Sequence, residues 1–164
     1  QGEELGLPQS ALPRAALVDP YDRMYWPDMP GRDGARVPLP WQAGAPASGF
    51  TSGTPWLPIP QVWAQRAIDS QAEDPQSTLS FARRMLALRR AEEPLHAGGF
   101  TAEALDNDVL VVTRTTSSGS LRAVFNLSEK AAPGPLPASE PLLATAPLGE
   151  EGLPPRAGFI DRLS

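Results

Sequence analysis

The strongest periodic pattern in the chain predicts a helix over residues 74–93. Its apolar residues recur at intervals of three and four, which places them on one helix face: Leu79, Ala82, Met85 and Leu86, widened by Phe81 and Leu88. Asp74 is a good N-terminal cap, Pro75 suits the first helical position, and Pro94 cannot continue the helix. Arginines occupy the opposite side. A helix with one apolar face must cover a core that other parts of the protein supply.

The residues after this helix alternate between apolar and polar, which predicts β-strands. Two such runs, 109–115 and 121–127, flank the small polar residues of 116–120, and this is the pattern of a β-hairpin. Shorter strands are predicted near 142–144 and 157–163. The second half of the chain is therefore expected to form a small antiparallel β domain.

Residues 6–60 show neither period. Eleven of the 20 prolines lie between Pro8 and Pro60, so this stretch is predicted to be a loop. A loop of such length is either functional or disordered. All four tryptophans and both tyrosines lie between residues 21 and 63, whereas disordered segments are poor in aromatic residues. We therefore expect an ordered loop held by buried aromatic rings, followed by a short helix within 61–70.

Composition excludes several chemistries. The 164 residues contain no cysteine and one histidine, which excludes a disulfide framework, a thiol nucleophile and a multi-histidine metal site. The formal net charge of -5 argues against a nucleic-acid-binding surface, and no run approaches the ~20 apolar residues of a membrane span. We expect neither a cofactor nor a bound metal, and no nucleic acid or membrane as partner.

One short segment carries the most suggestive chemistry. It places Arg32, Asp33 and Arg36 close in sequence to Trp26 and Trp41. Guanidinium donors and carboxylate acceptors beside aromatic faces can hold a sugar by its hydroxyl groups and its apolar ring face. The same residues suit an ion pair that fixes the loop equally well, so the residue types leave both interpretations open.

Two other candidates are weaker. Glu3 and Glu4 are paired carboxylates, but sequence neighbours on a strand point to opposite faces and cannot flank one glycosidic bond. We interpret them as structural carboxylates at the end of a strand. His96 follows the predicted helix in a Pro/Gly-rich turn without a second histidine or a cysteine, so we expect it to have no catalytic role.

The order and spacing of several motifs resemble a known family. The motifs are Gln1-Gly2-Glu3-Glu4-Leu5-Gly6-Leu7, Asp19-Pro20-Tyr21, Trp26-Pro27, Gly31-Arg32-Asp33-Gly34-Ala35-Arg36-Val37-Pro38-Leu39-Pro40-Trp41, Gly49-Phe50, Pro55-Trp56-Leu57-Pro58 and Asp74-Pro75-Gln76-Ser77. Together they resemble the C-terminal part of bacterial α-glucosidases of the α-amylase superfamily, glycoside hydrolase family 13, and are similar to oligo-1,6-glucosidases over the whole chain. Relatives usually have Cys, Thr and Met where this chain has Ala35, Val37 and Leu39, differences that concern packing and substrate preference.

The resemblance implies the C-terminal end of a (β/α)8 TIM barrel followed by a small antiparallel β-sandwich domain. Residues 1–94 would comprise the end of the eighth strand, a long loop on the active face and the last barrel helix, and residues 95–164 would form the β domain. The chain would then be a C-terminal fragment. Its missing N-terminal barrel portion would supply the sheet that the helix covers.

The activity that the resemblance implies is that of a retaining α-glucosidase, which hydrolyses or transfers α-linked glucose from short oligosaccharides. The catalytic carboxylates of the family lie on earlier strands, so none is expected here and the isolated chain is expected to be inactive. In relatives an arginine of the Arg-Asp-Gly-x-Arg stretch reaches the glucose subsite. That substrate-binding role falls first to Arg32 and second to Arg36, with Asp33 beside them. The expected partner is an α-glucoside oligosaccharide.

Three alternatives remain open at this point. One is an amino-acid transporter heavy chain that keeps the α-glucosidase fold without catalysis, which would need an N-terminal membrane helix. Within the same family, a sucrose or trehalose isomerase is the runner-up. From a different class, a non-catalytic carbohydrate-binding module could use the tryptophan-rich loop. The sequence upstream of Gln1 would separate them, because a barrel ending there supports an enzyme and a start codon supports a module.

Overall fold

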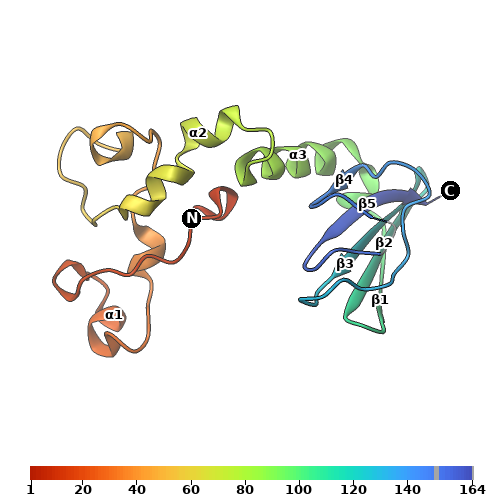
Figure 1. Ribbon diagram of the computed structural model, residues 1–164, viewed down its shortest axis with the longest axis horizontal. Helices are drawn as coiled ribbons and strands as arrows, with labels where there is room; N and C mark the ends of the chain where they lie inside the picture. Colours follow the sequence, from red (N-terminus) through yellow and green to blue (C-terminus); the bar gives the residue numbers. More distant parts are fainter. Residues whose placement is uncertain (150–151, 164) are drawn as a thin grey trace. The chain divides into compact units, whose positions relative to one another are not determined.

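The computed structural model describes residues 1–149 and 152–163, and the chain divides into two compact units. We call them the loop unit, Gln1–Ala82, and the sheet unit, Arg83–Ser164. The loop unit holds short helices and long connections, whereas the strands lie in the sheet unit (Figure 1). Within the described residues, none of the helices has the length and apolar character needed to cross a membrane.

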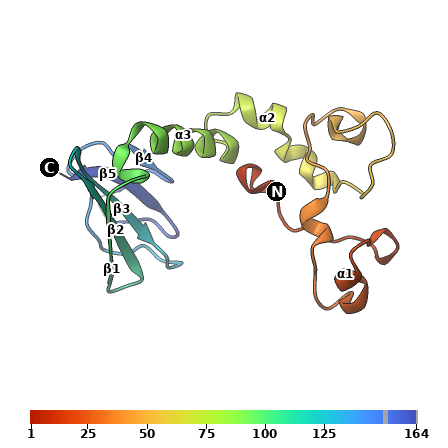
Figure 2. The same cartoon turned by 180° about the vertical axis from the view of Figure 1, so that it is seen from behind.

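Helices in the loop unit are short. The α-helices α1, Pro20–Tyr25, and α2, Ile68–Glu73, have six residues each, and both are also visible from behind (Figure 2). α1 begins at Pro20 because Asp19 caps it, accepting a hydrogen bond from the Tyr21 N–H at 2.9 Å. The short helix expected within 61–70 is a 3-10 helix, Gln61–Arg66, followed by α2.

The long helix α3 covers Thr78–Ala91, so it begins later than predicted. Ser77 is its cap, because its hydroxyl oxygen accepts a hydrogen bond from the Ser80 N–H at 3.1 Å. Asp74 instead accepts a hydrogen bond from the Gln76 N–H at 2.8 Å. Aspartate and serine side chains compete with the helix for nearby backbone groups. The predicted start at residue 74 is therefore wrong by about one turn.

The predicted apolar face of α3 is poorly covered. Leu79 is buried, but Leu86, about two turns further along, is 55% exposed. The four arginines on the other side, at 83, 84, 89 and 90, are exposed as expected. The helix thus presents apolar surface that the described residues leave in contact with solvent.

The apolar core of the loop unit is small and contains one tryptophan. Val37, Leu57 and Trp63 form its buried cluster, and Leu7, Leu12 and Ile59 pack against it. The expectation that buried aromatic rings hold this loop is wrong for the other rings. These are 41–57% exposed: Tyr21, Tyr25, Trp26, Trp41 and Trp56. A unit of this size has too little interior volume to enclose so many large side chains.

Five antiparallel strands form the sheet, in the order β1-β2-β3-β5-β4 (Figure 1). Their bounds are β1 Gly99–Leu105, β2 Val109–Thr116, β3 Gly119–Asn126, β4 Leu143–Ala144 and β5 Gly158–Leu163. The predicted hairpin is confirmed as β2 and β3, with Thr116 paired to Gly119. The two shorter predicted strands are confirmed as β4 and β5. The sequence analysis did not predict β1, whose alternating apolar residues include two small alanines and whose residues are nearly all exposed.

The sheet unit shows one sheet in the residues described, where two packed layers were expected. Its core consists of Val109, Val124, Ala132, Leu153 and Phe159. The stretch between β3 and β4 contributes one bridge to this core, from Ala132 to Leu153, and forms no further strand. That stretch is rich in proline, which lacks the N–H that a strand ladder requires. The antiparallel prediction is confirmed, and the sandwich prediction does not match the described sheet.

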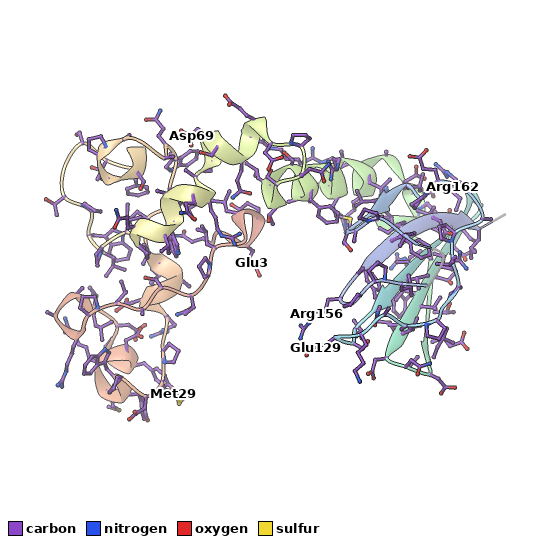
Figure 3. All side chains as sticks on the ribbon, in the orientation of Figure 1. Glu3, Met29, Asp69, Glu129, Arg156 and Arg162 are labelled. Carbon is purple, nitrogen blue, oxygen red and sulfur yellow. The ribbon has the colours of Figure 1, made fainter. Side chains whose placement is uncertain are left out.

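A buried amide fixes the loops at one end of the sheet. Asn126 is 1% exposed. Its amide nitrogen donates to three backbone carbonyls and its oxygen accepts from one backbone N–H: Lys130, Leu153 and Pro154 as acceptors and Ser128 as donor. Outside this amide, Arg156 and Glu129 form an exposed ion pair between the same two loops (Figure 3).

Candidate functional site

The three predicted site residues lie together in the loop unit. Asp33 and Arg36 begin and end a 3-10 helix, Asp33–Arg36, and Arg32 directly precedes it. Asp33 is 1% exposed, and its Oδ2 accepts hydrogen bonds from the backbone N–H groups of Val18 at 2.6 Å and Asp19 at 2.7 Å. The Asp33 side chain therefore joins two segments of the loop and does not face solvent.

Both arginines bind a carboxylate that the sequence analysis did not select, Asp19. Arg32 donates two hydrogen bonds to it, from Nε to Oδ2 at 2.6 Å and from Nη2 to Oδ1 at 3.1 Å. Arg36 donates a third, from Nη1 to Oδ2 at 3.0 Å. Asp19 thus joins both arginines while it caps α1.

The arginines keep Asp19 ionised. Hydrogen bonding from Arg32 is the main cause that lowers the pKa of the Asp19 carboxyl from 3.8 to about 2. Burial opposes this change in pKa, and the Tyr21 N–H and the charges of Arg32 and Arg36 reinforce it. The same hydrogen bond raises the pKa of Arg32. The ion pair between Asp19 and Arg32 therefore stays charged across the neutral pH range.

A second carboxylate fixes the backbone on both sides of Arg32. Asp22 accepts hydrogen bonds from the Gly31 N–H at 2.6 Å and from the Asp33 N–H at 2.9 Å. Gly31 is necessary here, because a Cβ at this position would lie 2.7 Å from the Asp22 carboxyl carbon. Asp22 is 6% exposed, so it acts on the loop and not on solvent.

The site is a charge-paired cluster. One carboxylate oxygen from each of Asp19, Asp22 and Asp33 lies within 4.8 Å of the other two, an arrangement that can attract a divalent cation. Nearly all these oxygens already accept hydrogen bonds from arginine or backbone N–H groups. Asp33 Oδ1 has no hydrogen bond in the described structure and lies 3.7 Å from Arg36 Nη1. Three carboxylates face two guanidinium groups, which leaves one excess negative charge.

The side chains of the two arginines are much more exposed than the Asp19 carboxylate that they bind. The Arg32 side chain is 67% exposed and that of Arg36 is 43% exposed, whereas the Asp19 side chain is 1% exposed. A guanidinium carries five N–H donors in a planar fork. Asp19 takes one edge of the Arg32 fork, and no described residue accepts a hydrogen bond from its Nη1. Arg32 is therefore the member of the cluster best able to bind a ligand.

An apolar cavity adjoins the cluster. It has a volume of about 480 Å³, and Asp22 and Gly34 are part of its wall. Leu12, Leu17, Trp26 and Met29 also line it, and Met29 is labelled in Figure 3. Ser10 also lines it, and its hydroxyl has no hydrogen-bond partner in the described structure. Asp22 and Gly34 thus connect the cluster with apolar side chains, whereas Arg32 and Arg36 are not among the residues that line this cavity in the described structure.

Sequence reasoning missed Asp19 and Asp22. A signal for Asp19 was available, because an aspartate directly before a proline is a helix-start pattern and Asp19-Pro20 belongs to one of the motifs noted. No spacing rule marks Asp22, whose partner Asp33 lies 11 residues away along an irregular loop.

The weaker candidates lie elsewhere. Glu3 and Glu4 begin a 3-10 turn, Glu3–Leu5, and not the end of a strand as expected, and both are exposed; Glu3 is labelled in Figure 3. His96 is exposed at the end of another turn, Glu93–Leu95. Neither position brings a second titratable group into a shared site within the described residues.

Comparison with protein families identifies the chain. Residues 1–98 match the family model described as alpha amylase, catalytic domain. The chain belongs to the α-amylase family. Residues 97–160 match a second family model, a domain of unknown function designated DUF3459. The resemblance inferred from the motifs is thereby confirmed.

Relatives within the α-amylase family include named glucosidases. A probable alpha-glucosidase of Rhizobium meliloti (strain 1021) is 41% identical over 137 residues, which is 84% of this chain and 25% of that protein. An oligo-1,6-glucosidase of Parageobacillus thermoglucosidasius is 32% identical over 102 residues, which is 61% of this chain and 18% of that protein. The chain spans about a quarter of the length of these relatives, or less.

Solved structures of the family share the fold. An alpha-glucosyl transfer enzyme is 34% identical, with a TM-score of 0.83 over 99% of this chain and 32% of that one. The trehalulose synthase of Pseudomonas mesoacidophila MX-45 also gives a TM-score of 0.83, over 100% of this chain and 35% of that one. The second pair is 22% identical, so it shows the fold alone.

Proposed function

We propose that this chain is the C-terminal part of a retaining α-glucosidase that hydrolyses or transfers α-linked glucose from short oligosaccharides. The observation that carries the proposal is the 41% identity over 137 residues with the Rhizobium meliloti protein named a probable alpha-glucosidase. The 34% identical alpha-glucosyl transfer enzyme supports glucose transfer as a second outcome of the same chemistry.

In this proposal residues 1–94 complete a (β/α)8 barrel and residues 95–164 form the domain that follows it. The two family matches, at 1–98 and 97–160, support a boundary in this region. The active site of such a barrel lies at the face where the loops after the strands gather. The loop unit would be one of these loops, and the poorly covered face of α3 would pack on the barrel sheet.

The chemistry would require two carboxyl groups about 5 Å apart across the scissile bond. One attacks the anomeric carbon and forms a covalent glucosyl-enzyme, while the other protonates the leaving oxygen. The second group then takes a proton from water, which releases glucose, or from a sugar hydroxyl, which completes a transfer. Glu3 and Glu4 are adjacent and exposed in a turn, so both catalytic groups would come from the rest of the protein.

The substrate-binding role would fall to Arg32 first and Arg36 second. Arg32 has the more exposed guanidinium and the free edge, so it can donate hydrogen bonds to glucose hydroxyls. Asp33 is buried against the backbone of residues 18 and 19. Its contribution would be to hold the loop in shape, not to contact the sugar.

The test compares the complete protein with residues 1–164 alone. We expect the complete protein to hydrolyse p-nitrophenyl α-D-glucoside and to release the α-anomer first, as observed by NMR. The chain alone should show no turnover. A complete protein that leaves α-glucosides intact would contradict the proposed activity. Turnover by the pure chain that disappears in Glu3→Gln or Glu4→Gln would contradict the absence of catalytic groups here.

Incubating the complete protein with sucrose and with trehalose separates the alternatives. A sucrose or trehalose isomerase would convert its disaccharide to an isomer with little free glucose, whereas the proposed enzyme would release glucose. The likeness to trehalulose synthase fits this runner-up at the level of the fold. A carbohydrate-binding module would bind oligosaccharides without converting them.

A further inference from the structure

We propose that Asp19 is a positioning residue for Arg32: it holds one edge of the guanidinium so that the opposite edge faces an uncharged, hydroxyl-bearing ligand. This inference rests on the proposed role of Arg32 in binding glucose. It assigns to a buried carboxylate a function that motif and family comparison leave undefined.

The first support is the two-point contact between the side chains. Arg32 donates from Nε at 2.6 Å and from Nη2 at 3.1 Å to the two oxygens of one carboxylate. Two parallel hydrogen bonds fix the plane of the guanidinium, which a single bond would leave free to rotate. The edge formed by Nη1 and the remaining N–H of Nη2 then has a defined direction. Such an edge can bind two neighbouring oxygens, as on adjacent hydroxyls of a pyranose ring.

The second support is that the backbone around Arg32 is fixed independently. Asp22 holds the N–H groups of Gly31 and Asp33, and Asp33 in turn holds the N–H groups of Val18 and Asp19. Because these bonds set where the Arg32 Cα lies, Asp19 has the remaining task of orienting its side chain. Loss of the Asp19 charge should therefore reorient the guanidinium without moving the loop.

The third support is burial. The Asp19 side chain is 1% exposed and that of Arg32 is 67% exposed. A ligand in solvent can reach the arginine and has little access to the carboxylate. Asp19 must therefore influence a ligand through Arg32, which distinguishes a positioning residue from a binding one.

The fourth support is charge. A free guanidinium binds carboxylates and phosphates more strongly than neutral hydroxyls. Here Asp19 cancels the charge of Arg32, and the whole cluster carries one excess negative charge, from Asp19, Asp22 and Asp33 against Arg32 and Arg36. An anionic ligand would therefore gain little electrostatic attraction at this edge, whereas the hydrogen bonds to a neutral sugar do not depend on an excess positive charge. Asp19 would thus set both the direction and the preferred ligand charge.

The test measures binding to residues 1–164 by NMR, using the backbone N–H signals of residues 31–36, which every variant retains, with D-glucose and D-glucose 6-phosphate as probes. We expect weak binding of glucose, with a Kd of roughly 10–100 mM, and no tighter binding of the phosphate. Asp19→Asn keeps an oxygen that can cap α1 but removes the charge and one acceptor. It should weaken glucose binding by roughly tenfold and make glucose 6-phosphate the preferred ligand. Asp69→Asn is the matched control, because Asp69 is an exposed carboxylate that also holds a loop N–H, that of Ala43 at 3.2 Å.

Two results would overturn the proposal: absence of glucose binding to the wild-type chain, or an unchanged preference between the two probes in Asp19→Asn. In an Arg32→Lys background, Asp19→Asn should have no further effect, because the residue through which it acts is gone. If Asp19→Asn does not fold, Arg32→Lys alone decides. Lysine can still pair with Asp19 but has no second edge, so glucose binding should be lost, and retained binding refutes the proposal. Hydrolysis by the complete protein is assayed separately, so an inactive protein that binds as described contradicts the proposed enzyme and not this inference.

Discussion

Three buried aspartates in the loop unit hold neighbouring backbone segments and one arginine side chain by hydrogen bonds. Asp33 holds the backbone at Asp19, Asp22 holds the backbone at Asp33, and Asp19 holds the side chain of Arg32. Each carboxylate is nine-tenths buried or more, and a buried charge is tolerable when hydrogen bonds to N–H groups and opposite charges replace water. This network supplements the apolar contacts of the loop unit, because it joins segments that lie far apart in the sequence.

At Arg32 and Arg36 the same substitution should have different consequences in the complete protein. Arg32→Lys should lower kcat/KM roughly 30- to 1000-fold with little change in Tm, because lysine cannot present a second planar edge to the substrate. Arg36→Lys should lower Tm more than turnover, because Arg36 is less exposed and its side chain contacts Asp19 and Asp33.

Steady-state kinetics and thermal melts of both variants measure these effects. Arg14→Lys is the matched control, since Arg14 lies in the same unit with its guanidinium carbon 6.0 Å from the centre of the Trp26 ring. The opposite pattern, a large kinetic loss in Arg36→Lys and a large loss of Tm in Arg32→Lys, would transfer the substrate role to Arg36.

The low pKa of Asp19 predicts how acid affects the loop unit. The Asp19 pKa falls from 3.8 to about 2, mainly through the hydrogen bonds from Arg32, so folding favours the ionised form. Its stabilising effect is therefore complete above pH 3.8 and disappears as the pH falls towards 2. Asp19→Asn should unfold at lower urea than wild type at pH 5, and the two midpoints should converge near pH 2. Tryptophan fluorescence reports on this unit, which holds all four tryptophans; a constant difference between midpoints would contradict the assignment.

At the scale of elements, the sequence predicts those helices and strands whose apolar residues recur with a regular period. Alternation located β2 and β3 with their turn, because one face of each strand packs into the core at Val109 and Val124. It missed β1, where Phe100, Ala102 and Ala104 alternate with Thr101 and Glu103 but two of the three apolar residues are small alanines. The arginines of the candidate site were visible as residue types. Their partner Asp19 depends on how an irregular loop folds back over 13 residues, which no period encodes.

Asn126 provides a test of how the end of β3 fixes the loops of the sheet unit. Asn126→Ala should lower the free energy of unfolding by about 2–4 kcal/mol, because it leaves several buried carbonyls and one N–H without their partner. Chemical unfolding followed by circular dichroism measures this loss. Thr101→Ala, at an exposed position of β1, is the control and should change stability by no more than about 0.5 kcal/mol. A similar loss in both variants would show that the Asn126 network contributes little.

At the scale of the whole molecule, the two units differ in what stabilises them. The sheet unit pairs its own strands across β1 to β5, around a main buried cluster of Val109, Val124, Ala132, Leu153 and Phe159. The loop unit forms no sheet among its described residues, and its buried apolar residues outside the main cluster, such as Leu5 and Leu17, are supplemented by the hydrogen bonds of its charged network. α3 has one buried residue, Leu79, along its length. The sheet unit should therefore be the more autonomous of the two, because helix stability in proteins comes mainly from packing of the apolar face.

Limited proteolysis of residues 1–164 with trypsin measures this difference. Trypsin should cut first in the loop unit and at the exposed arginines of α3, at 83, 84, 89 and 90, because poorly packed segments open most easily. The longest-lived product should begin after Arg90 and contain β1 to β3, since Arg114 and Arg122 within the strands are held by Pro94 O and by Asp161. Mass spectrometry of a time course identifies the products. Digestion of both units at the same rate would contradict the autonomy of the sheet unit. A stable product that contains the loop unit and ends within α3 would also contradict it.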